Sequence, residues 1–547
     1  MSEIFRLDNF GGVNLTDHPR DLADNEFAWA ENIYPLSPST LALRKGSSFA
    51  GGVSPADDYV QQALVGYNHS NGQRYIYGLF LFGSAPNRIT RLYLLDENET
   101  SWGTALFSGI LSSNEAYNPA WAIWRDRLYL LRSDGFLAEI EGGTVISTTE
   151  LSVTVDGGGL TIHPTLIGQY RNRMLYAGDP TYPNFLFFSN TDAPLTITAD
   201  AVIRVGRGDG GRIAAIASAG TTGGDAPAES QILILKEKGP PWLFRGDLPT
   251  AGANAGQADL HQLSVEADCI NHRTVALTPQ GLMWAGHKDV FLMRSKGALP
   301  ESVGYKIGPA LKTVPPALRH RMRAVYYDDF YRLMLERGPT LATATQQVWA
   351  DVRTPKITWW GPMTGGNWSD FYADHRPGYS SRLLASTARE AVSTWYSGRL
   401  YALDMSNHSE APLDSDILAP TPIRPVLRTK EYDFGDANQR KIIEAAELNF
   451  WNDRNRSVTV TFLGDTNRVV EVAYSAGGWT LGNTLPSGAL ASLHRQINFS
   501  AQSVARTVSR TLQLQIEATS LGNDTDVGAF YIQELVMRMR RIQRRVA

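Results

Sequence analysis

The chain has 547 residues, of which 43% are hydrophobic and 10% aromatic, so it can bury a large core and is not globally disordered. Its 51 basic and 55 acidic side chains give a net charge of −4, which argues against a protein that binds nucleic acid mainly through its overall charge. The single cysteine, Cys269, excludes an intramolecular disulfide and a cysteine-based zinc site, and the length favours two to four domains.

The first 49 residues are expected to form an N-terminal arm that carries one short helix. Asp24 can act as the N-cap of that helix, and Phe27, Ala30 and Ile33 follow at helical spacing. Almost everything after this point indicates strands, because short runs of aliphatic and aromatic residues alternate with glycine, asparagine, aspartate and proline. The chain is therefore predicted to be all-β apart from this segment.

A strand pattern recurs seven times in the middle of the chain. One anchor residue in each copy, at positions 77, 129, 176, 233, 284, 333 and 401, gives successive spacings of 52, 47, 57, 51, 49 and 68 residues. Repeats of about 40 to 50 residues with about four strands each are typical of propeller blades. We expect a β-propeller over residues 50–405, with six to eight blades and seven favoured; unrelated hairpins in sandwiches are the alternative. The copies are Arg74–Tyr77, Arg127–Leu130, Arg173–Tyr176, Ile232–Leu235, Gly281–Trp284, Tyr331–Met334 and Arg399–Ala402.

A second β unit is predicted after the propeller. Residues 406–422 are polar and proline-bearing, which suits a linker. Residues 423–547 are then expected to form a β-sandwich-like domain, in which Leu512, Leu514 and Ile516 alternate with polar residues on one strand. Its expected strands are 426–431, 445–451, 457–463, 468–474, 510–518 and 529–540. Two glycine- and alanine-rich stretches, 220–228 and 249–256, are predicted to be loops between blades.

No motif in the chain predicts catalysis, a cofactor or a metal. A GxGxxG pattern at 206–211 lacks the following helix that a dinucleotide site needs, so it is interpreted as a turn. Cys269 lies three residues before His272, but its apolar flanks place the thiol in the core. Asp328-Asp329 and Asp433 with Asp436 are the acidic pairs considered for glycan hydrolysis, and the aspartate box of sialidases is missing. We therefore expect no catalytic, cofactor-binding or metal-binding residues, and a protein that is not an enzyme.

The C-terminus carries the strongest local charge. Two interpretations are open: a solvated edge strand protected by its charge, or a segment that docks on an acidic partner or a nucleic-acid backbone. The residues are Arg538, Arg540, Arg541, Arg544 and Arg545.

Four N-terminal segments and the two last strands resemble one protein family. The N-terminal segments are Phe10-Gly11-Gly12-Val13-Asn14, Leu22–Glu26, Ala30–Ile33 and Leu43–Gly46, and the C-terminal ones are Leu512–Glu517 and Phe530–Leu535. Together they resemble the tail nozzle or tail hub proteins of short-tailed bacteriophages, which are virion proteins with a β-propeller body. Gly11 and Gly12 also suit a close backbone approach.

The resemblance implies a structural tail protein that is made in the host cytoplasm and works in the virion. It implies a ring of identical copies, for which a hexamer is expected, with a channel that DNA crosses only in transit during ejection. The implied partners are a tail adaptor and fibre or spike proteins, without stable membrane insertion. The candidate interface residues are Gly11, Gly12, Asn14, Arg538, Arg540, Arg541, Arg544 and Arg545.

Two other functions stay open. The first is a glycan-binding or glycan-degrading propeller, such as a depolymerase or receptor-binding protein, and the second is a monomeric propeller scaffold. In the tail interpretation the net charge of −4 suits a channel that does not hold DNA tightly, because each neutralised phosphate adds affinity. The C-terminal arginines are then expected outside the channel, at a contact between subunits or partners.

Overall fold

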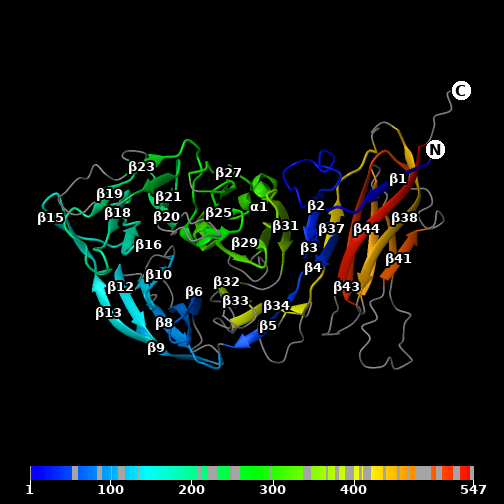
Figure 1. The fold of residues 1–547 in the computed structure, drawn as a ribbon. Helices are drawn as coiled ribbons and strands as arrows, with labels where there is room; N and C mark the ends of the chain where they lie inside the picture. The colour runs from blue at the N-terminus through cyan, green and yellow to red at the C-terminus, as the bar shows by residue number, and fades with distance from the viewer. Residues whose placement is uncertain are drawn as a thin grey trace.

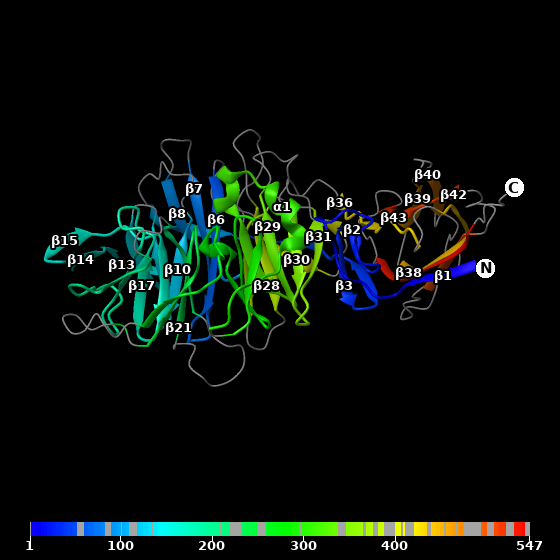
Figure 2. The same cartoon turned by 90° about the horizontal axis from the view of Figure 1, so that it is seen from above.

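The computed structural model describes two β structures side by side, with strands from the N-terminus between them (Figures 1 and 2). It describes the chain except residues 1, 52–58, 83–88, 100, 109–117, 133–134, 207–210, 219–230, 247, 249–258, 296, 337–345, 365–367, 376–380, 388–399, 406–408, 411–420, 435–438, 453–455, 465–468, 475–493, 500–507, 521–529 and 542–547.

The larger structure is a β-propeller, in which the described residues form seven four-stranded antiparallel blades. Blade 1 contains β6 (Tyr59–Asn68), β7 (Arg74–Phe82), β8 (Ile89–Leu95) and β9 (Trp102–Ser108); blade 2 contains β10 (Ala120–Trp124), β11 (Arg127–Leu131), β12 (Phe136–Glu141) and β13 (Thr144–Glu150). Blade 3 contains β16 (Leu166–Tyr170), β17 (Arg173–Ala177), β18 (Phe185–Phe188) and β19 (Val202–Arg204); blade 4 contains β20 (Ile213–Ser218), β21 (Gln231–Lys236), β22 (Trp242–Arg245) and β23 (Asp259–Gln262).

Blades 5 to 7 complete the ring. Blade 5 contains β24 (Ala276–Thr278), β25 (Gly281–Ala285), β26 (Val290–Met293) and β27 (Glu301–Ser302), and blade 6 contains β28 (Arg323–Tyr327), β29 (Phe330–Leu335), β30 (Gln346–Asp351) and β31 (Thr358–Met363). Blade 7 contains β32 (Trp368–Asp374), β33 (Arg382–Thr387), β34 (Leu400–Met405) and β5 (Gly46–Gly51). The innermost strand of blade 7, β32, packs against β6 of blade 1, which closes the circle.

The propeller prediction is confirmed, including the favoured number of blades. Six of the seven predicted copies form the second strand of a blade, but the last copy lies in β34, the third strand of blade 7. The equivalent second strand is β33, where Leu384 lies 51 residues after Leu333. The anomalous spacing of 68 residues therefore comes from comparing different strands.

Blade 7 is built from both ends of the chain. Its outer strand β5 pairs with β34 from Leu400↔Gly51 to Met405↔Gly46. The propeller therefore begins at Gly46 instead of residue 50. Four charged side chains join blades 1 and 7 beside this closure: Arg74 pairs with Asp374 and Glu99, and Arg382 contacts Glu99 at 2.6 Å and Asp374 at 3.0 Å.

The second structure is a β-sandwich, as predicted, but it includes N-terminal strands. One sheet contains β1 (Ser2–Leu7), β3 (Ile33–Ser37), β4 (Thr40–Leu43), β44 (Phe530–Arg541), β38 (Lys441–Asn452), β41 (His494–Phe499) and β42 (Val508–Ser509). The other contains β2 (Phe27–Glu31), β37 (Val426–Thr429), β43 (Leu512–Ser520), β39 (Arg456–Gly464) and β40 (Val469–Tyr474). Leu512, Leu514 and Ile516 are buried between the sheets, as the alternation predicts.

The sandwich is not separated from the propeller. Its second sheet continues into blade 6, because β2 pairs with β31 at Ala30↔Gly361 and with β37 on its other side. One hydrophobic cluster runs through both structures and includes Phe27, Trp359 and Leu514. The predicted unit 423–547 therefore shares its core with the propeller and with the N-terminal arm.

The predicted helix at residues 24–33 is wrong, because the segment contains β2. Phe27, Ala30 and Ile33 are all buried, as a helix would require. A bulge between Phe27 and Trp29 shifts the strand alternation by one residue, however, and Asn32 (φ 56°) turns the chain before Ile33. A bulge and a turn thus produce a spacing that imitates a helix.

The remaining described elements are short. They are the hairpin β14 (Ser152–Val155) and β15 (Gly158–Thr161), the two-stranded pair β35 (Ser409–Glu410) and β36 (Thr421–Pro422), the helix α1 (Gly308–Lys312), and the 3₁₀ turns η2 (His272–Thr274), η3 (Tyr305–Ile307) and η4 (Pro316–Arg321). Within the described residues, no helix is long and apolar enough to cross a membrane. The pair β35–β36 lies in the predicted linker, most of which is outside the described residues, as are the predicted loops 220–228 and 249–256.

Candidate functional site

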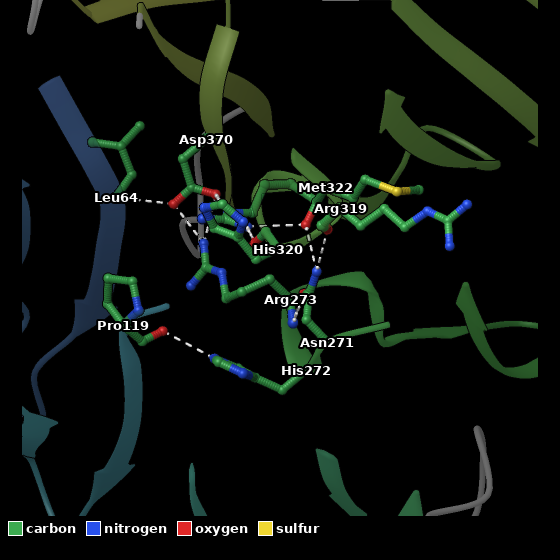
Figure 3. Close-up of polar contacts among 10 residues, drawn as sticks. Leu64, Pro119, Asn271, His272, Arg273, Arg319, His320, Met322 and Asp370 are labelled. Carbon is green, nitrogen blue, oxygen red and sulfur yellow. Dashed lines mark hydrogen bonds and ion pairs between the residues drawn. The ribbon is translucent and has the colours of Figure 1, made fainter. Parts of the chain in front are cut away.

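A cluster of polar side chains lies where the innermost strands of the propeller meet, and Figure 3 shows its contacts. We call Asn271, His272, Arg273, Arg323 and Asp370 the axial cluster. The turn η2, which carries His272 and Arg273, packs against β20, β25 and β28. The cluster therefore joins the segment before blade 5 to blades 6 and 7, and its contacts reach blades 1 and 2.

Asp370 is the acidic centre of the cluster and only 1% exposed. A register shift in β32 between Trp368 and Asp370 brings this carboxylate toward blade 1. Its Oδ2 accepts a hydrogen bond from the backbone N–H of Leu64 at 2.7 Å, and the Arg273 Nη2 donates to both of its oxygens at 2.5 Å. The Arg323 Nε lies 3.8 Å from Oδ1. One buried carboxylate thus holds together blades 1, 6 and 7 and the turn before blade 5.

Two contacts of η2 cross the propeller from blade 5 to blade 2. The guanidinium of Arg273 lies over the ring of Trp121, 4.0 Å from its centroid. The His272 Nε2 lies 2.9 Å from the carbonyl oxygen of Pro119, so this nitrogen is the donor (Figure 3). Because blades 2 and 5 lie on opposite sides of a seven-bladed ring, these side chains cross the propeller axis.

Asn271 holds the turn in place. Its Oδ1 accepts a hydrogen bond from the Arg273 backbone N–H at 2.8 Å, as the N-cap of η2. Its Nδ2 donates to the carbonyl oxygens of Arg319 (3.1 Å) and Met322 (3.2 Å). This side chain therefore fixes η2 against the start of blade 6.

Burial sets the charge states of two members of the cluster. Desolvation, followed by the nearby charge of Arg273, lowers the pKa of His272 to about 3, so the imidazole is neutral at ordinary pH. Desolvation and the charge of Arg273 also lower the pKa of Arg323 to about 9, against the opposing effect of Asp370. Arg323 therefore remains cationic at neutral pH, and the cluster combines two guanidinium groups with the Asp370 carboxylate.

This arrangement is suited to structure more than to catalysis. The Asp370 carboxylate is occupied by Arg273 and Leu64, and the His272 imidazole is occupied by Pro119. Cys269 is fully buried, as predicted, and burial raises the pKa of its thiol, whose sulfur donates to the Asn271 carbonyl. In the described part of the chain, no group of three His, Cys, Asp or Glu residues could hold a metal ion.

Two other motifs have structural explanations. The strand β20 begins two residues after Gly211, the last glycine of the GxGxxG pattern, where a dinucleotide site would need a helix; residues 207–210 lie outside the described residues. Asp328 and Asp329 both have positive φ angles, 50° and 66°, in the tight turn between β28 and β29. The acidic pair is thus a hairpin turn.

The N-terminal motif lies at the joint between propeller and sandwich. An added Cβ at Gly11 would lie 2.9 Å from the Asn25 side chain, and one at Gly12 would lie 2.7 Å from the Trp359 carbonyl oxygen. Gly12 also has φ +88°, and the N–H of Val13 donates to that same carbonyl at 2.7 Å. The two glycines therefore let the N-terminal chain pack directly on β31 of blade 6.

Asn14 is 4% exposed and belongs to the same joint. Its Nδ2 donates to Asp17 at 2.8 Å and to Glu26 at 3.2 Å. Burial alone would raise the pKa of Glu26, but hydrogen bonds, the first of them from Lys306 next to blade 6, lower it overall. In the single chain, Gly11, Gly12 and Asn14 thus make internal contacts.

Arg538, Arg540 and Arg541 lie in β44, which is not an edge strand, so the edge-strand interpretation is wrong for these three. The strand β44 pairs with β1 and β4 on one side and with β38 on the other. Arg538 is exposed on β44, whereas the side chains of Arg540 and Arg541 and the whole of Arg544 and Arg545 lie outside the described residues. The other interpretation, docking on a partner, stays a prediction.

Sequence reasoning did not single out Asp370, Arg273 or Arg323. The available signal was a carboxylate within an aromatic strand, Trp368-Ser369-Asp370-Phe371-Tyr372. A buried charge in such a strand needs a partner, but the partners here are distant in sequence.

Comparisons with known proteins show similarity in fold only. No protein-family model and no curated protein matches the chain. Among solved structures, the WD40 β-propeller domain of Doa1 is 7% identical, with a TM-score of 0.37 over 65% of this chain and 96% of that one. The Cps50 (Swd1) β-propeller domain of Myceliophteria thermophila is 8% identical, with a TM-score of 0.39 over 66% and 100%. PorZ of Porphyromonas gingivalis is 11% identical, with a TM-score of 0.38 over 87% and 65%.

The joint predicts that Gly12→Ala destabilises the protein more than Gly72→Ala. Gly72 has a similar φ of +84° but nothing within 4 Å of an added Cβ, so its replacement meets only the backbone penalty of about 1 kcal/mol. Gly12→Ala adds the overlap with Trp359 and is expected to lose about 2–4 kcal/mol. Denaturant unfolding of both variants measures this difference, and equal losses would contradict the packing described for Gly12.

The axial cluster predicts a pH-dependent stability. Below pH 6.5 the unfolded chain protonates His272, whereas the folded chain keeps it neutral down to about pH 3, so folding is disfavoured as the pH falls through this range. Through this one group, the free energy of unfolding can fall by at most about 1.4 kcal/mol per pH unit. His272→Gln should lose less stability than the parent between pH 7 and pH 5, because the variant has no imidazole at this position that the unfolded chain can protonate. Parallel unfolding curves for parent and His272→Gln would refute the assignment.

Proposed function

We propose that this chain is a structural subunit of a bacteriophage tail, in the nozzle or hub ring, and that it catalyses no reaction. The observation that carries the proposal is the position of the N-terminal motif. The segment that resembles tail proteins, Phe10–Asn14, is the one that joins the propeller to the sandwich. A mechanical role for these residues fits a building block of an assembly under load.

The rigidity of the chain supports the same role. The second sandwich sheet continues into blade 6, and a single hydrophobic cluster spans both structures. Inter-domain movement is the usual expectation where contacts are few, but it is opposed here by backbone pairing and a shared core. A ring built from such units keeps its channel geometry when partners dock on either face.

In this proposal DNA passes between copies and not through the propeller of one copy. Arg273 over Trp121 and His272 against Pro119 cross the propeller axis. A channel for DNA in transit is therefore formed where several copies surround a common axis, and the net charge of −4 favours weak contact with a polyanion. The tail adaptor and the fibre or spike proteins are the proposed partners on the remaining surfaces.

The C-terminal arginines are the proposed contact between copies. Arg538 is exposed on β44 and lies opposite Ile4 of β1 in the register, and Ile4 is itself 64% exposed. A basic segment beside an exposed apolar side chain suits an interface with an acidic surface of the next copy, where ion pairs set register.

The test is the size and shape of the purified protein with and without these charges. The parent chain should form a ring with a central hole, at about six times the chain mass of 60.2 kDa, by light scattering and electron microscopy. Changing Arg540, Arg541, Arg544 and Arg545 together to Ala should release monomers with an unchanged unfolding midpoint. Arg212→Ala, an exposed arginine paired with Glu237, is the matched control and should leave the ring intact.

Two outcomes would contradict the proposal. If the parent chain stays monomeric at every concentration, the proposed ring does not exist. If the protein releases reducing sugar from a capsular polysaccharide, a glycan-degrading propeller is favoured instead. If the ring still forms after the arginine changes, the proposed arginine contact between copies is contradicted, but the proposed ring is not.

A further inference from the structure

A lysine, a glutamate and an asparagine are linked by hydrogen bonds where the N-terminal chain packs on the segment between blades 5 and 6. The Nζ of Lys306, in η3, donates to the Oε1 of Glu26 at 2.5 Å, and the Nδ2 of Asn14 donates to the Oε2 of Glu26 at 3.2 Å. An amine and a carboxamide are thus held on the two oxygens of one carboxylate. We propose that Lys306 and Asn14 react once per chain to form an amide cross-link, with Glu26 transferring the protons.

Backbone contacts hold the two segments beside each other. The N–H of Leu15 donates to the carbonyl oxygen of Lys306 at 2.8 Å, and the hydroxyl of Thr16 donates to the carbonyl oxygen of Tyr305 at 2.5 Å. The Tyr305 hydroxyl donates in turn to the Oδ1 of Asp17 at 3.0 Å. The reacting side chains therefore start from neighbouring positions, which removes much of the entropic cost of joining two groups.

The carboxamide of Asn14 is suited to be the group that is attacked. Its Oδ1 accepts hydrogen bonds from the backbone N–H groups of Thr16 and Asp17, both at 3.2 Å. Two backbone donors on one carbonyl oxygen stabilise the negative charge that develops there when an amine adds to the carbon. The Nδ2, which would leave, also donates to the Oδ2 of Asp17 at 2.8 Å. Asn14 is 4% exposed, so little water competes for its carbonyl carbon.

Glu26 is placed to transfer protons between the two nitrogens. Its carboxylate is within hydrogen-bond reach of both the attacking Nζ and the leaving Nδ2, which is the geometry that a general acid–base needs. The Oε2 also accepts from the backbone N–H of Ala23 at 3.1 Å, which fixes the orientation of the carboxylate.

The resting state of the pair is an ammonium group and a carboxylate. Burial alone would raise the pKa of Glu26, but hydrogen bonds, the first of them from Lys306, lower it overall. The free amine of Lys306 is therefore a minor state. A minor state is sufficient here, because the reaction happens only once in each chain and the loss of ammonia makes it irreversible.

The reaction needs no other reagent. Lys306 gives a proton to Glu26, and its free amine forms a bond to the Cγ of Asn14 while the carbonyl electron pair moves to Oδ1. Glu26 then gives its proton to Nδ2, the pair on Oδ1 restores the carbonyl, and the Cγ–Nδ2 bond breaks to release ammonia. Glu26 takes a second proton from Nζ and passes it to the ammonia. The products are the Nζ–Cγ amide, an ammonium ion and the original carboxylate. The Lys306 side chain is 27% exposed, so the ammonium ion can reach solvent.

The position of the cross-link gives it a role. Asn14 directly follows the glycines that pack on β31, and Lys306 lies between blades 5 and 6. The amide would tie the N-terminal chain, and with it the sandwich, covalently to the propeller. The reaction takes place within one chain, so it is compatible with a protein that turns over no substrate, and it does not depend on the assembly to which the protein belongs.

The first experiment measures the intact mass of the denatured full chain. The parent should be lighter than its sequence mass by one ammonia molecule. Lys306→Arg keeps the positive charge and Glu26→Gln keeps the shape, but both variants should have their full sequence mass. Lys430→Arg is the matched control, because Lys430 pairs with Asp24 at 2.8 Å at the same joint, and this variant should lose ammonia as the parent does.

The second experiment locates the bond in the parent and does not depend on the variants folding. Because trypsin does not cleave after an acylated lysine, its digest should contain one branched peptide that joins residues 7–20 to residues 297–312. A parent with its full sequence mass would overturn the proposal and leave Lys306 and Glu26 as a permanent ion pair. Complete cleavage after Lys306, with residues 7–20 recovered as a separate peptide, would overturn it as well.

Discussion

The fold depends on the N-terminal 51 residues, which supply strands to both structures and to their joint. β1, β3 and β4 complete one sheet of the sandwich, β2 links the other sheet to blade 6, and β5 closes blade 7. Apart from β3, which pairs with β4, each of these strands pairs with a partner from the far end of the chain, such as β44 or β34, or from blade 6. Contacts of such sequence separation require large loops to be closed, so the joint can complete only after nearly the whole chain has been made.

Buried charges concentrate where these distant segments meet. The axial cluster ties blade 7 to blade 1 through Asp370, and the network of Arg74, Glu99, Asp374 and Arg382 joins the same two blades a second time. Elsewhere, neighbouring blades are held by apolar clusters made of sequence-adjacent strands. Apolar packing alone allows several similar arrangements of the strands. Ion pairs need a fixed geometry, so they favour one of these arrangements.

The repeat architecture could be predicted from sequence because a blade is a local feature. Alternating apolar residues and turn signals recur within about 50 residues, and they marked six of the seven second strands and most strands of the sandwich correctly. β2 could not be recognised, because a bulge next to Phe27 and a turn at Asn32 imitate helical spacing. Asp370 and Arg273 were missed because they are 97 residues apart and meet only when blades 5 and 7 close around blade 6. The motif Gly11-Gly12 could be recognised from the sequence. Its contact with Trp359 could not, because no residue pattern near either segment indicates that the two meet.

The central claim is that the propeller and the sandwich are one mechanical unit held by the N-terminal chain. Differential scanning calorimetry of the intact protein tests this most directly, because two units that share a core and a sheet must unfold together. The account predicts a single unfolding transition. Its van't Hoff enthalpy should equal its calorimetric enthalpy per mole of chain, because the full chain is one cooperative unit. Two separated transitions, with the sandwich melting while the propeller remains folded, would contradict it.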